Sequence, residues 1–395
     1  MKILGIESSC DETAAAVVQD GRSLLSNVIN SQIDIHAVYG GVVPEVAARS
    51  HIEVINPVID QALTDANLTW DDIDAIAVTY APGLVGSLLI GTLAARTLAL
   101  LKNKPLYPIH HVEAHVYANF ITEFGSSQAA GTSFHSNPLQ PKSDQAPGPS
   151  SDLERSRITK EIVSKGEQPE FPMLALIVSG GHSQLVLFRG HGDYELLGQT
   201  CDDAVGEAFD KVAKIIGLPY PGGPSIAQAA LSGNPHAYKL PKAKLSGKYD
   251  FSFSGLKTAT LRAVQREVGV DFTFPSTQLA ACLDDQQRHD FAASFQQIAI
   301  ETLVDQTEKA FHDYNPKSVV IAGGVAANQE LRRQLSERLP LPIEYAPMNL
   351  CTDNAAMVAS LGYYYAQQKQ PTNPFDLEVI PSLSMVKSAA NLKKT

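Results

Sequence analysis

The stretch Ile3-Leu4-Gly5-Ile6, continued by Glu7-Ser8-Ser9-Cys10-Asp11-Glu12 and then by residues 13–18, decides the fold. An apolar run, a polar turn and a second apolar run predict two antiparallel strands. The pair Asp20-Gly21 predicts a turn into a third strand over residues 23–29. We therefore expect three consecutive antiparallel strands at the start of the chain.

The same order of elements recurs near the middle of the chain. Residues 173–178 are apolar, Ser179-Gly180-Gly181-His182-Ser183 is a polar turn, and residues 184–188 are apolar again. A turn at Gly190-His191-Gly192 leads into residues 194–198. The repeat predicts two similar halves whose polar turns meet over a cleft. Small residues leave backbone N–H groups free to bind phosphate oxygens, although a plain hairpin explains either turn taken alone.

Two further glycine elements follow. Residues 317–322 predict a strand, Gly323-Gly324-Val325 a tight turn, and the chain from Ala326 a helix. This order is neither the G-x-G-x-x-G dinucleotide motif nor a P-loop, since no Gly-Lys-Ser/Thr follows. Pro221-Gly222-Gly223-Pro224 predicts a fourth loop with exposed amides, stiffened by its prolines.

A candidate metal pair lies in His110-His111-Val112-Glu113-Ala114-His115, after a strand-like run at 104–109. Imidazoles four residues apart share one helical face and can bind one metal ion, unless the two lie together by chance. A zinc peptidase helix has the order H-E-x-x-H. Here Glu113 lies two residues from each histidine and points away from their face, which disfavours a metalloprotease. Asp353, just ahead of a helix-like run at 355–366, is the candidate third ligand, and such a set suits iron(II) or zinc.

Composition sets further limits. The 395 residues suffice for two domains, and 44% hydrophobic with 18% charged residues is typical of a globular protein. No run approaches 18 apolar residues and an acid, Glu7, comes early, so we expect a cytoplasmic protein with no membrane role. The four cysteines form no CxxC pair. A net charge of −11 argues against indiscriminate nucleic-acid binding, but not against a local basic patch.

Two segments have unusual compositions. Residues 125–170 carry nine serines, five prolines and one aromatic, Phe134, which predicts a mobile surface insertion with a short charged helix over 152–166; a partner-docking loop is the alternative. Residues 238–262 carry six basic side chains against one acid, interleaved with Tyr249, Phe251 and Phe253. This pattern predicts either an RNA contact or a solvated lysine face over buried aromatics.

Six motifs together resemble a known family. They are Gly5-Ile6-Glu7-Ser8-Ser9-Cys10-Asp11-Glu12-Thr13, Gly40-Gly41-Val42-Val43-Pro44-Glu45, residues 110–115, Ser179-Gly180-Gly181-His182, residues 203–211 and residues 322–328. In this order they look like the bacterial tRNA N6-adenosine threonylcarbamoyltransferase family (TsaD, formerly Gcp or YgjD), related to the KEOPS catalytic subunit. The 125–170 insertion and the tail depart from the compact family pattern but touch none of these motifs.

The resemblance implies an actin-like ASKHA fold, with two ribonuclease-H-like α/β lobes around a nucleotide cleft. The expected parts are an N-terminal lobe over 1–124, the insertion over 125–170, a C-terminal lobe over 171–374 and a tail over 375–395, with the option that the last helix packs back on the first lobe. The implied activity moves a threonylcarbamoyl group from threonylcarbamoyl-adenylate to N6 of the adenosine 3′ to the anticodon, in tRNAs that read codons starting with A. An ASKHA-type kinase or ATPase, or a non-catalytic subunit of a tRNA-modifying complex, is the alternative.

The resemblance also implies the site residues and partners. The metal ligands would be His111, His115 and Asp353, with one iron(II), or zinc, per subunit. The substrate loop, binding the adenylate or ATP/ADP, would be Ile177-Val178-Ser179-Gly180-Gly181, completed by Asp210, Gly223 and Asn328. Expected partners are tRNA, a paralogous TsaB-like subunit, a small TsaE-like ATPase and a threonylcarbamoyl-adenylate synthase. Asp11 and Glu12 are our candidates for accepting the amine proton; alternatively they only order their turn.

Overall fold

The computed structural model describes residues 1–124, 132–133 and 167–386. Two compact units form. The first consists of described residues of Met1–Gln168 and Asp353–Ser384, and the second of those of Pro169–Thr352 and Met385–Lys394. The expectations for the insertion and the last nine residues therefore lie mostly outside the described chain. The last helix packs within the first unit, so the main stretch of the second unit stops at Thr352, and the described residues 385–386 belong to the second unit again.

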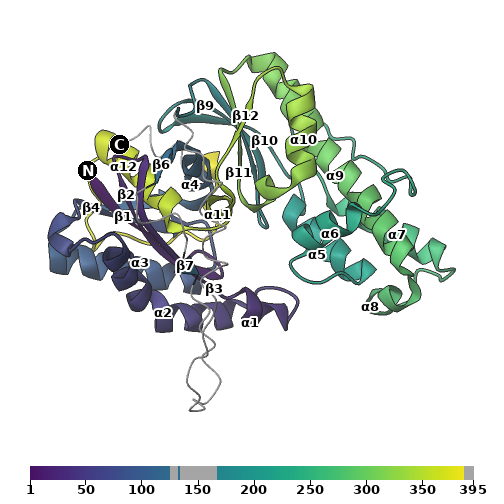
Figure 1. Ribbon diagram of the computed structural model, residues 1–395, viewed down its shortest axis with the longest axis horizontal. Coiled ribbons are helices and arrows are strands. Elements are labelled where there is room, and N and C mark those ends of the chain that lie inside the picture. The colour runs from purple at the N-terminus through teal and green to yellow at the C-terminus, as the bar shows by residue number, and fades with distance from the viewer. Residues whose placement is uncertain (125–131, 134–166, 387–395) are drawn as a thin grey trace, which may run out of the picture. The chain divides into compact units, whose positions relative to one another are not determined.

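The first unit is built on a mixed sheet (Figure 1). Its strands are β1 (Lys2–Glu7), β2 (Glu12–Gln19), β3 (Ser23–Ser31), β4 (Ala75–Ala81), β5 (Leu106–His110), β6 (Glu123–Phe124) and β7 (Thr132–Ser133). Their order is β5-β4-β1-β2-β3-β6, with β7 also paired to β3. Strands β1, β2 and β3 are antiparallel neighbours, while β4 runs parallel to β1 and β5 parallel to β4. The predicted turn between β2 and β3 forms at Asp20 and Gly21, both with positive φ.

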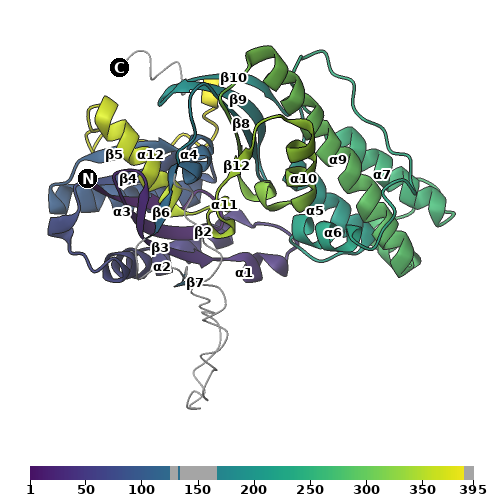
Figure 2. The ribbon, with the colours of Figure 1, turned by 45° about the horizontal axis from the view of Figure 1, so that its top comes forward.

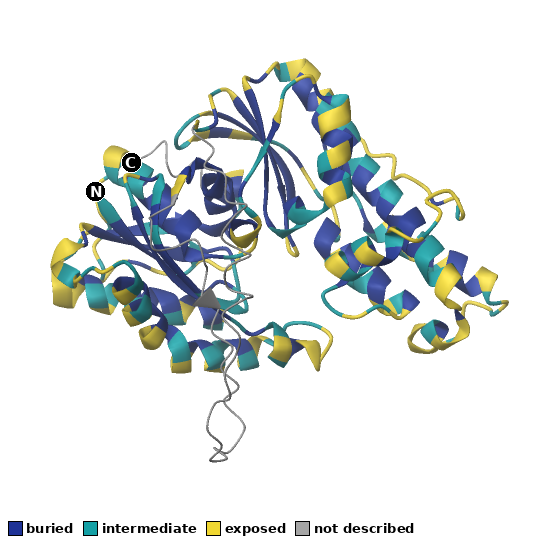
Figure 3. Cartoon of the chain, in the orientation of Figure 1, coloured by how far each residue is buried: buried dark blue, intermediate teal, exposed yellow. Residues whose placement is uncertain are grey.

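Helices cover both faces of this sheet (Figure 2). They are α2 (Pro44–Asp65), α3 (Val85–Lys102), α4 (His111–Tyr117) and α12 (Ala355–Gln368). The short helix α1 (Ile33–Ala37) follows β3, and 3-10 turns form at Trp70–Asp72 and Ala118–Phe120. Side chains alternate along a strand. Leu4 and Ile6 of β1 accordingly join one apolar core with α2 and α3, while Gly5 faces α12 on the other side. The buried strands stand out in Figure 3.

Glycines allow α12 to lie directly on the sheet. A Cβ added at Gly5 would lie 2.3 Å from the Ala355 carbonyl oxygen, and one added at Gly362 would lie 2.5 Å from the Ala77 Cβ. No side chain fits at either distance, so glycine at both positions sets how closely helix and strand approach.

The second unit repeats the plan of the first. Its strands are β8 (Met173–Val178), β9 (Ser183–Gly190), β10 (Asp193–Gln199), β11 (Ser318–Ala322) and β12 (Ile343–Tyr345). Their order, β10-β9-β8-β11-β12, corresponds to β3-β2-β1-β4-β5, with the same relative directions. The predicted pair of related α/β halves is confirmed.

The helices of the second unit lie between β10 and β11 and after β11. They are α5 (Val205–Ile216), α6 (Gly222–Ala230), α7 (Ser254–Glu267), α8 (Ser276–Leu279), α9 (Asp285–Tyr314), α10 (Gln329–Arg338) and α11 (Met348–Cys351), with 3-10 turns at Ala280–Cys282 and Gly324–Ala327. Two expectations need correction. The helix expected from Ala326 starts at Gln329, because Asn328 caps it, and the loop expected at 221–224 is instead the first turn of α6.

Helix α3 combines a packed face with an exposed apolar face. Among the described helices it alone has the length and mean hydropathy, 1.4, that would allow a membrane crossing. Leu88, Ala95 and Ala99 are nevertheless buried, and the helix packs on α2 and β4. Leu89 and Leu93, one helical turn apart, are 41% and 50% exposed. Helix α3 is thus an integral part of the first unit with an uncovered apolar face.

Candidate functional site

The structure brings together the three predicted metal ligands within the first unit. His111 and His115 lie one turn apart on α4, with ring centroids 4.7 Å apart, and Asp353 precedes α12. Asp353 Oδ1 lies 3.5 Å from His111 Nε2 and 3.2 Å from His115 Nε2. One potential ligand atom from each residue lies within 4.8 Å of the others. Two imidazoles and a carboxylate therefore converge from segments about 240 residues apart in sequence.

Glu7, which sequence reasoning did not assign to the site, orients this group. Its side chain is fully buried at the end of β1. Glu7 Oε2 lies 3.0 Å from His111 Nδ1 and accepts a hydrogen bond of 2.6 Å from Thr79 Oγ1, while Oε1 accepts one from the Ser9 N–H at 2.6 Å. With Nδ1 facing a carboxylate, the His111 Nε2 atom is left for a ligand. The one sequence feature that could have pointed to Glu7 is its position as an acidic residue at the end of an apolar strand.

Burial and charge oppose each other at this cluster. Burial acts against the ionised form of Asp353, but the facing His111 holds the pKa of Asp353 well below its usual value. Burial likewise opposes charge on His111, yet Asp353 and Glu7 raise the pKa of His111 well above its usual value. The two carboxylates thus favour positive charge at His111, whether a proton or a metal ion supplies it.

The chemistry of His115 tests whether these residues fit a metal. Its side chain is buried, and neither ring nitrogen has a hydrogen-bond partner among the described residues. His115 Nε2 lies 3.2 Å from Asp353 Oδ1, but the two groups are not oriented to form a hydrogen bond. An unsatisfied buried polar group costs about 1–3 kcal/mol, which coordination to a metal would offset. The residues therefore fit a divalent ion with two nitrogen ligands and one oxygen ligand.

Glu113 lies outside this cluster. Its buried carboxylate accepts a hydrogen bond of 2.9 Å from Tyr365 Oη on α12. Helix α4 therefore presents its histidines to Asp353 and its acid to Tyr365 of α12. This arrangement supplies no base of the zinc-peptidase kind.

Asp11 and Glu12 lie in the same unit, Asp11 in the turn before β2 and Glu12 as the first residue of β2. Ser31 Oγ donates to Glu12 Oε1 at 3.3 Å, and the Asp11 carbonyl accepts a hydrogen bond from the Gln32 N–H. Burial raises the pKa of Glu12 well above its usual value, and the neighbouring Asp11 adds to the rise. These contacts fit both a role in ordering the turn and a role in proton transfer.

The predicted substrate loop, from Ile177 to Gly181, lies in the second unit at the end of β8. Ser179 N–H donates to the His182 carbonyl at 2.8 Å, and Ser179 Oγ accepts from the His182 N–H at 3.2 Å. Ile177 and Val178 are buried strand residues. A Cβ added at Gly180 or Gly181 would meet nothing within 4 Å. The closed turn therefore exposes the backbone of its two glycines.

Neighbouring glycines pack closely against this turn. Gly323 has φ +89°, and a Cβ there would lie 2.4 Å from the Val178 carbonyl oxygen. A Cβ at Gly206, in the first turn of α5, would lie 2.6 Å from the Ser179 carbonyl oxygen. The ends of β8 and β11 and the start of α5 thus meet at one point, where a helix N-terminus and glycine amides favour anions.

Asp210 and the glycines after Pro221 form a second contact. Asp210 Oδ1 accepts a hydrogen bond of 2.6 Å from the Gly222 N–H. Burial raises the pKa of Asp210, against the effect of that N–H, and Glu207 adds to the rise. A Cβ at Gly223 would meet nothing within 4 Å. The Asp210 carboxylate thus ties α5 to the start of α6 and leaves the backbone of Gly223 open.

Asn328 serves the fold directly. Its Oδ1 caps α10 by accepting from the Leu331 N–H at 3.1 Å, and its Nδ2 donates to Gln296 Oε1 at 2.9 Å. It follows the Gly323 turn by five residues. Its predicted role toward a nucleotide is an additional function for a side chain that already has two hydrogen bonds.

The chain resembles a known protein family over most of its length. The family model described as TsaD, tRNA N6-adenosine threonylcarbamoyltransferase, matches residues 23–128 and 158–360. Proteins of that name from Thermomicrobium roseum and Symbiobacterium thermophilum are 47% and 46% identical, over 98% and 97% of this chain and 97% and 96% of their own lengths. A third, from Dehalococcoides mccartyi, is 46% identical over 98% of this chain and 99% of its own.

Solved structures show the fold alone. Full-length HypF in its phosphate- and nucleotide-bound form gives a TM-score of 0.53 at 12% identity, over 93% of this chain and 46% of that chain. HypF from T. kodakarensis gives 0.53 at 12% identity, over 93% and 48%. The expected actin-like ASKHA α/β fold is confirmed. Residues 23–128 and 158–360 match the family model, and identities of 46–47% extend over nearly the full length. The chain therefore belongs to the family of tRNA N6-adenosine threonylcarbamoyltransferases.

Proposed function

We propose that this chain transfers the threonylcarbamoyl group of threonylcarbamoyl-adenylate to N6 of the adenosine 3′ to the anticodon, in tRNAs that read codons starting with A. The near full-length identity of 43–47% to eight proteins named for this transfer carries the proposal. The N6 amine attacks the carbamoyl carbon, a C–N bond forms, the C–O bond to the adenylate phosphate breaks, and AMP leaves with its electron pair. One amine proton must be accepted. Action on tRNA implies a cytoplasmic location.

His111, His115 and Asp353 would hold one divalent metal. Their fit rests on the convergent ligand atoms and on the His115 nitrogens that lack a hydrogen-bond partner among the described residues. Two imidazoles and one carboxylate with further positions open suit iron(II), which we propose, with zinc as the alternative. When bound, such an ion supplies Lewis-acid polarisation of a carbonyl oxygen. Glu7 holds the His111 ring so that Nε2 faces Asp353.

The second unit would bind the adenylate. Exposed glycine amides at Gly180, Gly181 and Gly223 suit phosphate oxygens, and Asp210 suits ribose hydroxyls as a charge-assisted acceptor. Ile177, Val178, Ser179 and Asn328 complete the proposed site. Holding both reactants in place contributes on the order of 7–11 kcal/mol to lowering the barrier when alignment is good.

The His111→Ala, His115→Ala double variant should lose its metal and its activity together. The assay supplies threonylcarbamoyl-adenylate, unmodified tRNA, the paralogous subunit and the small ATPase, with metal analysis of the protein and mass spectrometry of the nucleoside. We expect modification to fall more than about 100-fold, since loss of outer-shell partners alone costs about 10–100-fold. Full activity of a folded, metal-free variant would refute the metal role.

Two Glu→Gln variants separate the effect of orienting the His111 ring from the effect of removing a buried charge. Glu7→Gln should weaken metal affinity roughly 10–100-fold, because an amide holds the His111 ring less firmly than a carboxylate. Glu113→Gln removes an equally buried charge from the ligand helix itself, but its partner is Tyr365. It should leave metal affinity unchanged. Equal losses in both variants would mean that Glu7 acts only through stability.

Valine at Gly181 or Gly223 should impair nucleotide binding without unfolding the chain. Both positions have open space around an added Cβ, so a side chain there would block only a ligand that approaches the backbone. We expect at least about a tenfold loss of AMP or ADP affinity by calorimetry. Gly190→Val, equally open but at the end of β9, is the control. Unchanged affinity in both test variants would remove these loops from the site.

We further propose that the Asp11-Glu12 pair accepts the amine proton. Glu12→Gln should then lower kcat about 10²–10⁴-fold with little change in KM, because an amide cannot accept the proton and burial, with the neighbouring Asp11, raises the pKa of the Glu12 carboxylate and so its basicity. Asp11→Asn tests the other member. If the pair only orders the turn, both variants should lower thermal stability and keep kcat in the folded fraction.

The exposed face of α3 would bind the paralogous subunit. An apolar stripe on a helix that is otherwise packed suits a protein contact. Leu89→Glu with Leu93→Glu should weaken subunit binding at least about 100-fold in sedimentation experiments, while the isolated chain stays folded because both side chains are exposed. Leu231→Glu is the control, because Leu231 is 74% exposed in the second unit. This change should leave subunit binding unaltered. Equal binding by all three proteins would place the contact elsewhere.

A further inference from the structure

A groove of about 560 Å³ lies in the second unit, at the C-terminal half of α7. Residues of α7 form one wall, and the segments at 239–241 and 270–272 form the others. Its charged lining consists of Lys239, Arg262, Arg266 and one acid, Asp271. A local excess of cations is notable in a chain with 42 acidic and 31 basic residues.

The three cations are available to a ligand. Lys239, Arg262 and Arg266 are exposed, and none forms an ion pair with a described residue. Arg262 donates one hydrogen bond, to Gln265 at 2.8 Å. The Asp271 carboxylate accepts hydrogen bonds from the N–H and hydroxyl of Thr273, so it is engaged in its own turn. The groove therefore presents positive charge.

An exposed aromatic ring completes the lining. Phe272 is 74% exposed, and the Arg262 guanidinium lies 5.9 Å from its ring centroid. A cationic groove that also offers an aromatic face is the arrangement by which proteins bind single-stranded nucleic acid: cations follow the phosphates and a base stacks on the ring. Binding an acidic peptide requires the cations but not the ring.

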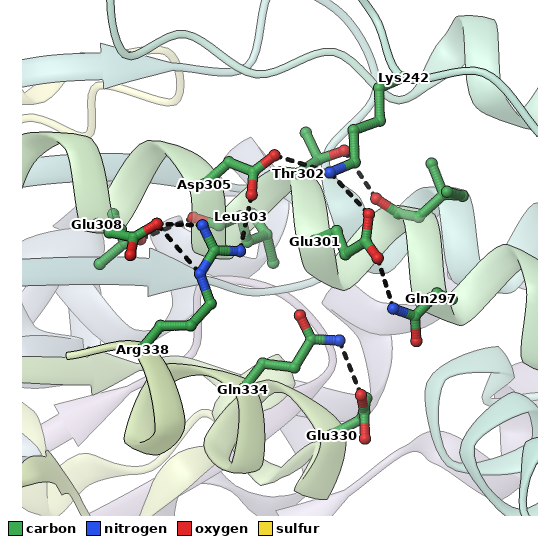
Figure 4. A network of polar contacts seen from close by, with 12 residues as sticks. Lys242, Gln297, Glu301, Thr302, Leu303, Asp305, Glu308, Glu330, Gln334 and Arg338 are labelled. Carbon is green, nitrogen blue, oxygen red and sulfur yellow. Dashed lines mark hydrogen bonds and ion pairs between the residues drawn. The ribbon is translucent and has the colours of Figure 1, made fainter.

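Three other cations of the 238–262 segment, Lys242, Lys248 and Lys257, are already paired with acids. Lys242 lies 2.7 Å from both Glu301 and Asp305 of α9, as Figure 4 shows. Lys248 pairs with Asp313 at 2.8 Å and Lys257 with Asp203 at 2.6 Å.

The aromatics that suggested an RNA contact from sequence belong to the core. Tyr249, Phe251 and Phe253 are 5%, 0% and 0% exposed, so the interpretation that they stack bases is wrong. An RNA contact in this region must use other side chains.

We infer that this groove binds the phosphate backbone of a single-stranded RNA segment, with one unstacked base on Phe272. The identity of that RNA as tRNA rests on the proposed function. Lys239, Arg262 and Arg266 neutralise successive phosphates, and the acidic remainder of the chain repels RNA elsewhere. The groove therefore acts in substrate binding and takes no part in the transfer step.

The test measures the Kd of unmodified tRNA against salt concentration. A variant with Lys239, Arg262 and Arg266 all changed to Gln should bind about 10–100-fold more weakly at 0.1 M salt. Its slope of log K against log salt should fall by about 2, since each cation on a single strand contributes about 0.7. Phe272→Ala should weaken binding about tenfold with the slope unchanged, and Phe272→Trp should restore it.

A matched triple variant controls for net charge. Lys214, Lys244 and Lys317 are exposed lysines of the same unit that do not line the groove, and changing all three to Gln removes the same charge. It should change the Kd less than about threefold, whereas an equal loss in both triples would overturn the inference. If the variant with all three groove cations changed does not fold, the single changes Lys239→Gln and Phe272→Ala, each in an exposed segment, test the inference. Each should weaken tRNA binding by itself.

Turnover separates this inference from the proposed function. If the chain modifies tRNA, the groove variants should raise KM for tRNA and leave kcat unchanged. Unaltered KM and Kd would refute the groove while the transferase stands. If the wild type binds tRNA through the groove but forms no modified nucleoside, the groove stands and the proposed function fails. Competition by an acidic peptide, with no RNA binding, would assign the groove to a protein partner.

Discussion

The buried carboxylate of Glu7 is the constraint on which the candidate metal centre depends. An unpaired charge at a fully buried position costs several kcal/mol, so the chain must bring partners to it. Thr79 comes from β4, His111 from α4 and the Ser9 N–H from the turn after β1. The strand order β5-β4-β1 delivers all three to one point. Stabilising Glu7 therefore also fixes the orientation of His111, and fold and site share one requirement.

The third ligand depends on packing of a different kind. Asp353 directly precedes α12, whose N-terminus is capped by the buried Asn354. The helix lies on β1 at a distance that only glycine permits, since a Cβ at Gly5 would lie 2.3 Å from the Ala355 carbonyl oxygen. Close packing transmits small displacements. Asp353 lies in the short loop before α12, and the backbone contact between α12 and β1 holds the helix that follows it in place.

The repeated strands could be predicted from the sequence because runs of apolar residues and the residue preferences of turns depend only on residues close together in the chain. Asp20 and Gly21 adopt the positive φ that their types favour, and β8 has the predicted bounds. The histidine pair was also predictable, since helical spacing is local. The role of Glu7 was not, because a carboxylate in a polar turn and one buried beside a histidine have the same sequence signal. The start of α10 was misplaced by three residues because Asn328 caps it.

Charge along the sequence is a poor guide to charge available on the surface. Helix α9 carries acids that face the basic segment before α7, and these hold Lys242 as well as Arg338 of α10. Such pairs contribute little stability individually when exposed, but they occupy their cations. A ligand that competes for Lys242 must first separate it from two carboxylates. Cations that form no ion pair with a described residue, such as Arg266, meet an anion at no such cost. Lys242 differs from Arg266 because the folded chain places the acids of α9 beside Lys242. A count of lysines along the sequence cannot predict that contact.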